Sequence, residues 1–354
     1  MKMTFRWYGE GQDAIPLKYI RQIPNVSGVV TSLLTKQAGE VWTLEEVRRM
    51  SEAVHAEGLE CEVIESVNIH EDIKLGLPSR KQYIENYIET MQNLSLIGIK
   101  VICYNFMPVL DWARSDLHYD LPDGSNTMFF GTEFIKNTTP KQLADKYAAD
   151  SGGVALPGWE PERLAKIERT IEQYKSVTQE QYWENAKYFL DAVIPWAERL
   201  DIKMAIHPDD PPWNIFGLPR MINNRENIAR FLALHDSPYN GLTLCTGSIG
   251  ADRNNDVPAI IREFADKIHF AHVRNLKFVG DDFYESAHLT SAGSLDMYAI
   301  MKALRDSGFE GYIRPDHGRM IWDEKGRPGY GLYDRALGIA YLNGLWEAIG
   351  HEQI

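Results

Sequence analysis

KMAIHPDDPP (203–212) shows the pattern that decides the fold. A short apolar run of β type ends at His207, and Pro208, Asp209, Asp210 and two further prolines follow it. Proline has no N–H group for a central strand, so regular pairing stops there. The stretch therefore predicts a buried strand whose carboxyl end carries polar side chains of the kind that bind ligands.

Similar apolar runs alternate along the chain with longer segments of helical periodicity. Residues 43–58 are typical of the helices, with Thr43 as N-cap, a glutamate at the third helical position and Gly58 after the last turn. Eight strands interleaved with helices predict an α/β fold, a (β/α)₈ TIM barrel, with a doubly wound sheet as the alternative. The strands are expected at 4–8, 27–32, 61–66, 100–106, 203–208, 242–247, 269–274 and 311–316, and the helices at 43–58, 79–98, 178–200, 224–235, 256–266, 294–308 and 333–349.

Residues 107–177 are too long for an ordinary loop between the fourth strand and its helix. They include WARSDLHYDLPDGSNTMFFGTEF (112–134), which is dense in aromatic residues, proline and glycine. We expect an ordered excursion, either a lid over the barrel mouth or a dimer arm, within a single domain that spans residues 1–354.

The net charge of −13, without a run of basic residues, argues against nucleic acid and anionic membranes as partners. The N-terminus lacks the apolar region of a signal peptide, and no apolar run is long enough for a membrane span. Cys61, Cys103 and Cys245 form no CxxC pair, which favours a reducing compartment, the cytoplasm. We expect two of these cysteines to pack as small hydrophobic side chains.

The last four expected strands share a feature at their carboxyl ends. They read MAI-His207, LTL-Cys245, HFA-His272 and IRP-Asp316. Histidine, cysteine, aspartate and glutamate together make up fewer than a fifth of the residues, so one of them at all four ends is more than chance provides. Strands five to eight are neighbours in a (β/α)₈ barrel, and this face carries the chemistry of such enzymes.

Two imidazoles, a thiolate and a carboxylate suit a divalent transition ion such as Zn²⁺, Fe²⁺, Mn²⁺ or Co²⁺. Taken singly, each residue has an ordinary explanation as a hydrogen-bonded histidine, a buried thiol or a turn cap. A closed structural zinc site is the main rival. It is disfavoured because a chain of 354 residues can bury a large core without a metal.

Further polar residues near these strand ends suit an anionic, hydroxylated substrate. Arg314 precedes Asp316 by two residues, so the period of a strand points both side chains the same way. Arg274 follows His272 by two residues. Either guanidinium can hold a carboxylate bidentately, or form a salt bridge at the rim instead. Asn105 ends the fourth strand and is a candidate for binding a substrate hydroxyl.

Two residues are candidates for proton transfer. His317 follows Asp316 directly and is either a general acid or base or part of a turn. Tyr330 lies in GRPGYG, where a phenol either donates a proton or only packs. Asp209 and Asp210 either accept a hydrogen bond from an imidazole or are solvated acids of a turn, the second being the expectation for at least one of them.

Five motifs together resemble mannonate dehydratase of the xylose-isomerase-like barrel type, over essentially the whole chain. They are FRWYG (5–9), MAIHPDDPP (204–212), LCTGSIG (244–250), HFAHVRN (269–275) and RPDHGRM (314–320). The resemblance implies dehydration of D-mannonate to 2-dehydro-3-deoxy-D-gluconate, a step of hexuronate breakdown, with Mn²⁺ or Fe²⁺. The metal positions that it implies fall on the same four strand ends, and its acid and base candidates on His317 and Tyr330. A homo-oligomer, a dimer, is the expected assembly.

This reaction requires removal of the C2 proton and protonation of the departing C3 hydroxyl, and a divalent ion would neutralise the charge that develops beside the carboxylate. Two rival functions remain open from the residues. One is a metal-dependent sugar isomerase or epimerase on the same barrel, for which a ligand set dominated by carboxylates is expected. The other is a non-catalytic protein that binds sugar acids and holds a structural zinc.

Overall fold

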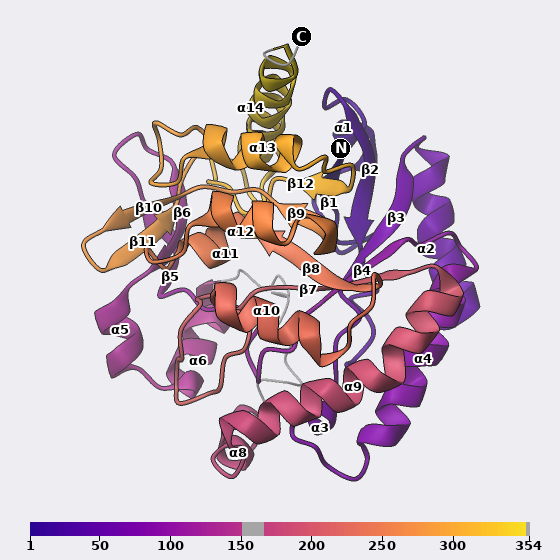
Figure 1. Ribbon diagram of the computed structural model, residues 1–354. Helices are drawn as coiled ribbons and strands as arrows, with labels where there is room; N and C mark the ends of the chain where they lie inside the picture. The colour runs from indigo at the N-terminus through magenta and orange to yellow at the C-terminus, as the bar shows by residue number, and fades with distance from the viewer. Residues whose placement is uncertain (151–165, 352–354) are drawn as a thin grey trace.

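A computed structural model describes residues 1–150 and 166–351. Eight parallel strands close into a barrel in the order β1-β12-β9-β8-β7-β4-β3-β2 (Figure 1). Each strand therefore lies beside its predecessor in the barrel, which confirms the predicted (β/α)₈ fold and shows that the doubly wound alternative is wrong. The barrel strands are β1 (Lys2–Arg6), β2 (Val26–Thr31), β3 (Glu60–Glu65), β4 (Val101–Tyr104), β7 (Lys203–Ile206), β8 (Asn240–Cys245), β9 (Ile268–His272) and β12 (Tyr312–Arg314).

The strand register brings several strand ends to one level. Cys245 of β8 and Arg314 of β12 are both register partners of His272 on β9, which lies between them. The interior of the barrel below this level is apolar, with Val63, Cys103 and Phe270 among the residues that fill it. The candidate ligands at the carboxyl end of the barrel therefore lie next to an apolar layer of its interior.

The helices form where the helical periodicity predicts them. Thr43 caps α2 (Leu44–Ala56) in a capping box with Glu46, and Gly58 beyond its end has a positive φ of 73°. Three short helices, α1 (Leu17–Ile20), α3 (Glu71–Lys74) and α11 (Thr246–Gly250), were not anticipated. The remaining helices around the barrel are α4 (Arg80–Ser95), α9 (Gln179–Leu200), α10 (Arg225–Leu234), α12 (Val257–Glu263) followed by η1 (Ala265–Lys267), α13 (Met297–Asp306) and α14 (Leu332–His351).

A second, antiparallel sheet lies at one side of the barrel (Figure 1). Its order is β10-β11-β6-β5, so it joins two hairpins that are far apart in the chain. The first hairpin, β5 (Asp116–Asp120) and β6 (Asn126–Phe130), belongs to the expected excursion, which also contains α5 (Thr132–Asn137), α6 (Pro140–Asp150) and α8 (Ile167–Tyr174). Part of that excursion, residues 151–165, lies outside the described residues. The second hairpin, β10 (Leu276–Val279) and β11 (Asp282–Glu285), was not predicted.

Cys61 and Cys103 are each 1% exposed, as expected of cysteines that pack as hydrophobic side chains. Burial raises the pKa of Cys61 to about 12 and that of Cys103 well above its usual value. Both therefore remain thiols. Within the described parts of the chain, no helix has the length and apolar character needed to cross a membrane.

Candidate metal centre

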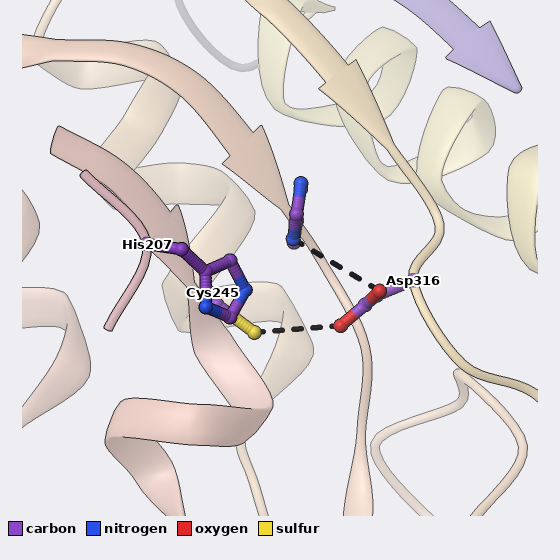
Figure 2. A group of neighbouring side chains, drawn as sticks. His207, Cys245 and Asp316 are labelled. Atoms are coloured by element: carbon purple, nitrogen blue, oxygen red, sulfur yellow. Dashed lines mark hydrogen bonds and ion pairs between the residues drawn. The ribbon is translucent and has the colours of Figure 1, made fainter. Parts of the chain in front are cut away.

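The four predicted ligands come together at the carboxyl end of the barrel. His207 follows β7, Cys245 and His272 end β8 and β9, and Asp316 lies two residues beyond β12. One ligand atom from each side chain lies within 4.8 Å of all the others. Figure 2 shows His207, Cys245 and Asp316 directed toward a common point, with Sγ of Cys245 3.4 Å from Oδ2 of Asp316. The predicted convergence is therefore confirmed.

The two histidines are prepared for such a role. Nδ1 of His207 lies 2.7 Å from the carbonyl oxygen of Pro208. Because a carbonyl only accepts, Nδ1 carries the hydrogen and Nε2 is left for another partner, as is usual for histidines that bind metals. His272 is fully buried, with its Nε2 3.3 Å from Oε2 of Glu65 and its Nδ1 3.9 Å from Oδ1 of Asp316. A carboxylate beside one ring nitrogen orients the ring, and Nδ1 is the atom on the side of the other candidate ligands.

Cys245 is in the form that binds metals. Burial opposes ionisation of the thiol, but the positive charge of Arg274 and hydrogen bonds with His207 and His272 lower its pKa to about 5. Ser248 also donates a hydrogen bond to Sγ, at 3.0 Å. Against burial, which lowers it, the Cys245 thiolate raises the pKa of His207 to about 9. A divalent ion would therefore replace a proton between these two side chains.

Asp316 completes the set as a carboxylate. Burial alone would raise its pKa, but His317, Arg314 and His272 hold it well below the usual value. Nη1 of Arg314 lies 2.9 Å from Oδ1, and Nε of Arg274 lies 2.8 Å from Oδ2. The acid is thus ionised and held in place from two sides.

A second group of possible ligands, Glu65, Cys103 and His272, is less suitable. Arg314 already binds both carboxylate oxygens of Glu65, at 2.8 and 3.0 Å. The raised pKa of Cys103 keeps it a thiol, which is a poor metal ligand. The group at His207, Cys245, His272 and Asp316 is therefore the candidate metal centre.

A cavity open to solvent lies beside the candidate metal centre. It is lined by six of the predicted functional residues: Asn105, His207, Arg314, Asp316, His317 and Tyr330. Nε2 of His317 and the hydroxyl of Tyr330 are 2.8 Å apart. The two candidates for proton transfer thus form a hydrogen-bonded pair at the cavity wall.

The two predicted carboxylate-binding arginines take the salt-bridge alternative, but in the interior rather than at the rim. Arg314 reaches the cavity, although Glu65 and Asp316 already occupy much of its guanidinium. Arg274 is fully buried and binds Asp210, Glu285 and Asp316. Its position behind the metal ligands suits it to control their charge.

The expectation for Asp209 and Asp210 is wrong in both of its forms. Both residues are buried, at 3% and 2% exposure, so neither is a solvated turn acid. Asp209 accepts the backbone N–H groups of Met221 and Ile222, each at 2.7 Å, where the loop after β7 folds back. Asp210 binds arginines and not an imidazole.

Asp210 belongs to a buried group of four charged residues, the charge cluster, which the sequence did not suggest. Its members are Arg114, Asp210, Arg274 and Glu285. Arg114 binds both oxygens of Asp210, at 2.8 and 3.0 Å, and its Nη2 lies 2.6 Å from Oε1 of Glu285. Arg274 also binds both acids. Two positive and two negative side chains thus connect the excursion, the barrel and the second hairpin.

Two of the missed residues had a signal in the sequence. Glu65 ends β3, so the strand-end argument that found the four ligands would have found it on an earlier strand. Glu285 lies in a hairpin whose two-residue connection, Gly280-Asp281, is a common hairpin turn. Arg114 had no such signal, because it lies in an irregular part of the excursion.

Comparisons with known proteins agree with the geometry. The model of the family "D-mannonate dehydratase (UxuA)" matches residues 1–354. The chain is 59% identical over 352 residues to mannonate dehydratase of Thermotoga neapolitana, covering 99% of this chain and 98% of the relative. The crystal structure of mannonate dehydratase from Streptococcus suis serotype 2 has a TM-score of 0.90 and 44% identity, covering 100% of this chain and 96% of the other.

A more distant likeness concerns the fold alone. A structure of L-ribulose 3-epimerase has a TM-score of 0.56 at 12% identity and covers 99% of this chain and 96% of its own. It shares the barrel architecture, whereas the similarities at 44% and 59% identity extend over nearly the whole length of both chains. The chain belongs to the D-mannonate dehydratase family.

Proposed function

We propose that this chain is a hydro-lyase that converts D-mannonate to 2-dehydro-3-deoxy-D-gluconate and water in hexuronate breakdown. The match to the family model, which covers residues 1–354, supports this reaction. One observation carries the mechanism: four ligand-type side chains converge beside a hydrogen-bonded histidine–tyrosine pair at one cavity.

His207, Cys245, His272 and Asp316 would hold the divalent ion. Two nitrogens, a thiolate and a carboxylate suit Fe²⁺ or Mn²⁺, either of which accepts further oxygen ligands from a substrate. When bound, such an ion supplies Lewis-acid stabilisation of the negative charge that develops at the substrate carboxylate. The ionised Cys245 and Asp316 support this assignment, since both ligands are already deprotonated.

The chain's own residues would move the protons. Dehydration takes one proton from C2 and returns one to the C3 hydroxyl as it leaves, because hydroxide is a poor leaving group. We assign both transfers to His317 and Tyr330, which face the cavity 2.8 Å apart. Asn105, which lines the cavity, would bind a substrate hydroxyl. Arg314, which lines the cavity while it is held by Glu65 and Asp316, would attract the substrate carboxylate by its positive charge. Arg274 would act indirectly, through its contact with Asp316.

Cys245 bears on the cellular compartment that we propose for the enzyme. A thiolate ligand has to stay reduced, and all three cysteines are free, so we place the enzyme in the cytoplasm. Its partner is a small sugar acid rather than nucleic acid or a membrane. A homodimer remains our prediction for the assembly, as does a lid or dimer arm for the excursion of residues 107–177.

The test is turnover of D-mannonate after anaerobic purification and metal analysis, with Mn²⁺ or Fe²⁺ restored. We expect His317→Asn to retain the metal and to lower kcat by about 10²-fold or more, as for other acid–base groups. If the kcat of His317→Asn stays within a few-fold of the wild-type value, His317 is not an acid or base of the reaction. Formation of an isomer without loss of water would favour an epimerase, and metal-dependent stability without turnover would favour a binding protein.

A further inference from the structure

Glu285 lies behind the histidine of the proposed proton-transfer pair. It ends β11 of the added sheet, outside the barrel, and is fully buried. Its Oε1 lies 3.3 Å from Nδ1 of His317, on the opposite side of the ring from Tyr330. A carboxylate, an imidazole and a phenol thus form a chain of contacts that ends at the cavity wall.

The surroundings of Glu285 fix the direction of these hydrogen bonds. Two guanidinium groups, of Arg114 and Arg274, bind its two oxygens. An ionised carboxylate only accepts hydrogen bonds, so Nδ1 of His317 is the donor in their contact. In the neutral form of the ring, which is the form able to accept a proton, Nε2 then carries the lone pair, and the hydroxyl of Tyr330 donates to it.

We propose that Glu285 is a positioning residue for the dehydration, which holds His317 with Nε2 toward the cavity as a proton acceptor. The inference rests on the proposed function and deepens it by giving His317 and Tyr330 separate roles. The C2–H bond of the substrate breaks, its proton bonds to Nε2, and its electron pair stays in the substrate between C2 and the carboxylate. The imidazolium that forms is stabilised by the negative charge of Glu285. Tyr330, as the donor of the pair, protonates the C3 hydroxyl. The C3–O bond breaks, water leaves, and the electron pair at C2 forms the C2=C3 bond of an enol that becomes the 2-keto product. The imidazolium of His317 then returns its proton to the Tyr330 phenolate, 2.8 Å away.

A purely structural role is the competing explanation, because Glu285 also balances two buried arginines. Glu285→Asp separates the two roles. It keeps the negative charge beside Arg114 and Arg274 but is shorter by one methylene, so its contact with His317 is lost. We expect kcat to fall about 10- to 10²-fold, less than for loss of the histidine itself, with KM and metal content unchanged.

A matched control lies on the same strand. Asp282 accepts the backbone N–H of Thr132 at 2.7 Å. Among the described residues it forms no hydrogen bond with His317 or Tyr330. Asp282→Asn changes another carboxylate of β11, and more severely because the charge is lost, yet we expect kcat close to that of wild type. If Glu285→Asp also stays within two-fold of wild type, the proposal is overturned.

Nitrogen-15 NMR of the histidines tests the same contact without turnover. In zinc-loaded wild-type protein, with the His317 signals assigned by their loss in His317→Asn, we expect the hydrogen on Nδ1. A hydrogen on Nε2 would overturn the proposal, even where Glu285→Asp fails to fold. If wild-type protein does not dehydrate D-mannonate, the proposed function fails, and the NMR result still decides whether Glu285 fixes the ring.

Discussion

The barrel rim and the added antiparallel sheet contribute to the site in different ways. All four candidate ligands come from the rim, where parallel strands end side by side. The added sheet contributes Glu285, which contacts His317, and the excursion contributes Arg114, which binds Glu285. A barrel thus gathers ligands by its topology alone, whereas the sheet affects the site only through buried charges. We therefore expect variants of the rim to lose bound metal, and variants of the buried charges to lose stability or turnover while the metal stays bound.

The largest effect is expected at the rim. Cys245→Ala removes a thiolate ligand, so we expect loss of bound metal and a fall in kcat of about 10³-fold or more, since the ion stabilises the transition state by several kcal/mol. Metal analysis and D-mannonate turnover measure both. Cys61→Ala removes another buried thiol, remote from the centre, and should keep metal and turnover. Full activity with stoichiometric metal in Cys245→Ala would break the distinction.

The next effect is expected in the charge cluster. Arg114→Met leaves the buried carboxylates of Asp210 and Glu285 with Arg274 as their remaining guanidinium, so we expect a loss of about 3–5 kcal/mol in the free energy of unfolding. The metal should remain bound, because every ligand stays in place. Denaturant unfolding and metal analysis test this.

A surface arginine is the control for that variant. Arg253 is exposed and donates to the carbonyl oxygen of Gly280 at the turn of the second hairpin. Arg253→Met should change the free energy of unfolding by less than about 0.5 kcal/mol. Equal losses in the two variants would mean that burial of the charge cluster contributes nothing particular to stability.

The smallest effect is expected at a helix cap that contributes no side chain to the candidate metal centre or to the charge cluster. Thr43→Ala removes the hydroxyl that accepts the backbone N–H of Glu46 at 3.4 Å in the capping box of α2, and should cost about 1 kcal/mol of stability. Thr43→Ser keeps the hydroxyl and should restore most of it. Neither variant should alter kcat or metal content, and a change in either quantity would show that the helical shell is coupled to the site.

The local parts of the fold were predictable from the sequence. Strand runs, the capping box at Thr43 and the four strand-end ligands all follow from patterns within a few residues. The pairing of β6 with β11 was not predictable in this way, because Phe129 and Tyr284 meet across two hairpins that periodicity treats separately. The charge cluster depends on that pairing, so it was missed as well.

Arg274 shows a second limit. It was expected to face the substrate as His272 faces the metal, two residues away along a strand. The strand ends at His272, so the alternation of side chains does not extend to Arg274. Its side chain turns instead into the charge cluster, where Asp210 and Glu285 neutralise it. The sequence therefore identified Arg274 as a residue near the site, but it did not predict the direction of its side chain.

The ion pair between Arg114 and Glu285 has a consequence for protein synthesis. The two residues are 171 positions apart in the chain. A ribosome that has made the excursion and its arginine must therefore complete most of the second half of the barrel before the partner carboxylate exists. Until then the nascent polypeptide contains Arg114, which is buried in the folded protein, without its nearest carboxylate. The complete pocket can therefore form only late in translation.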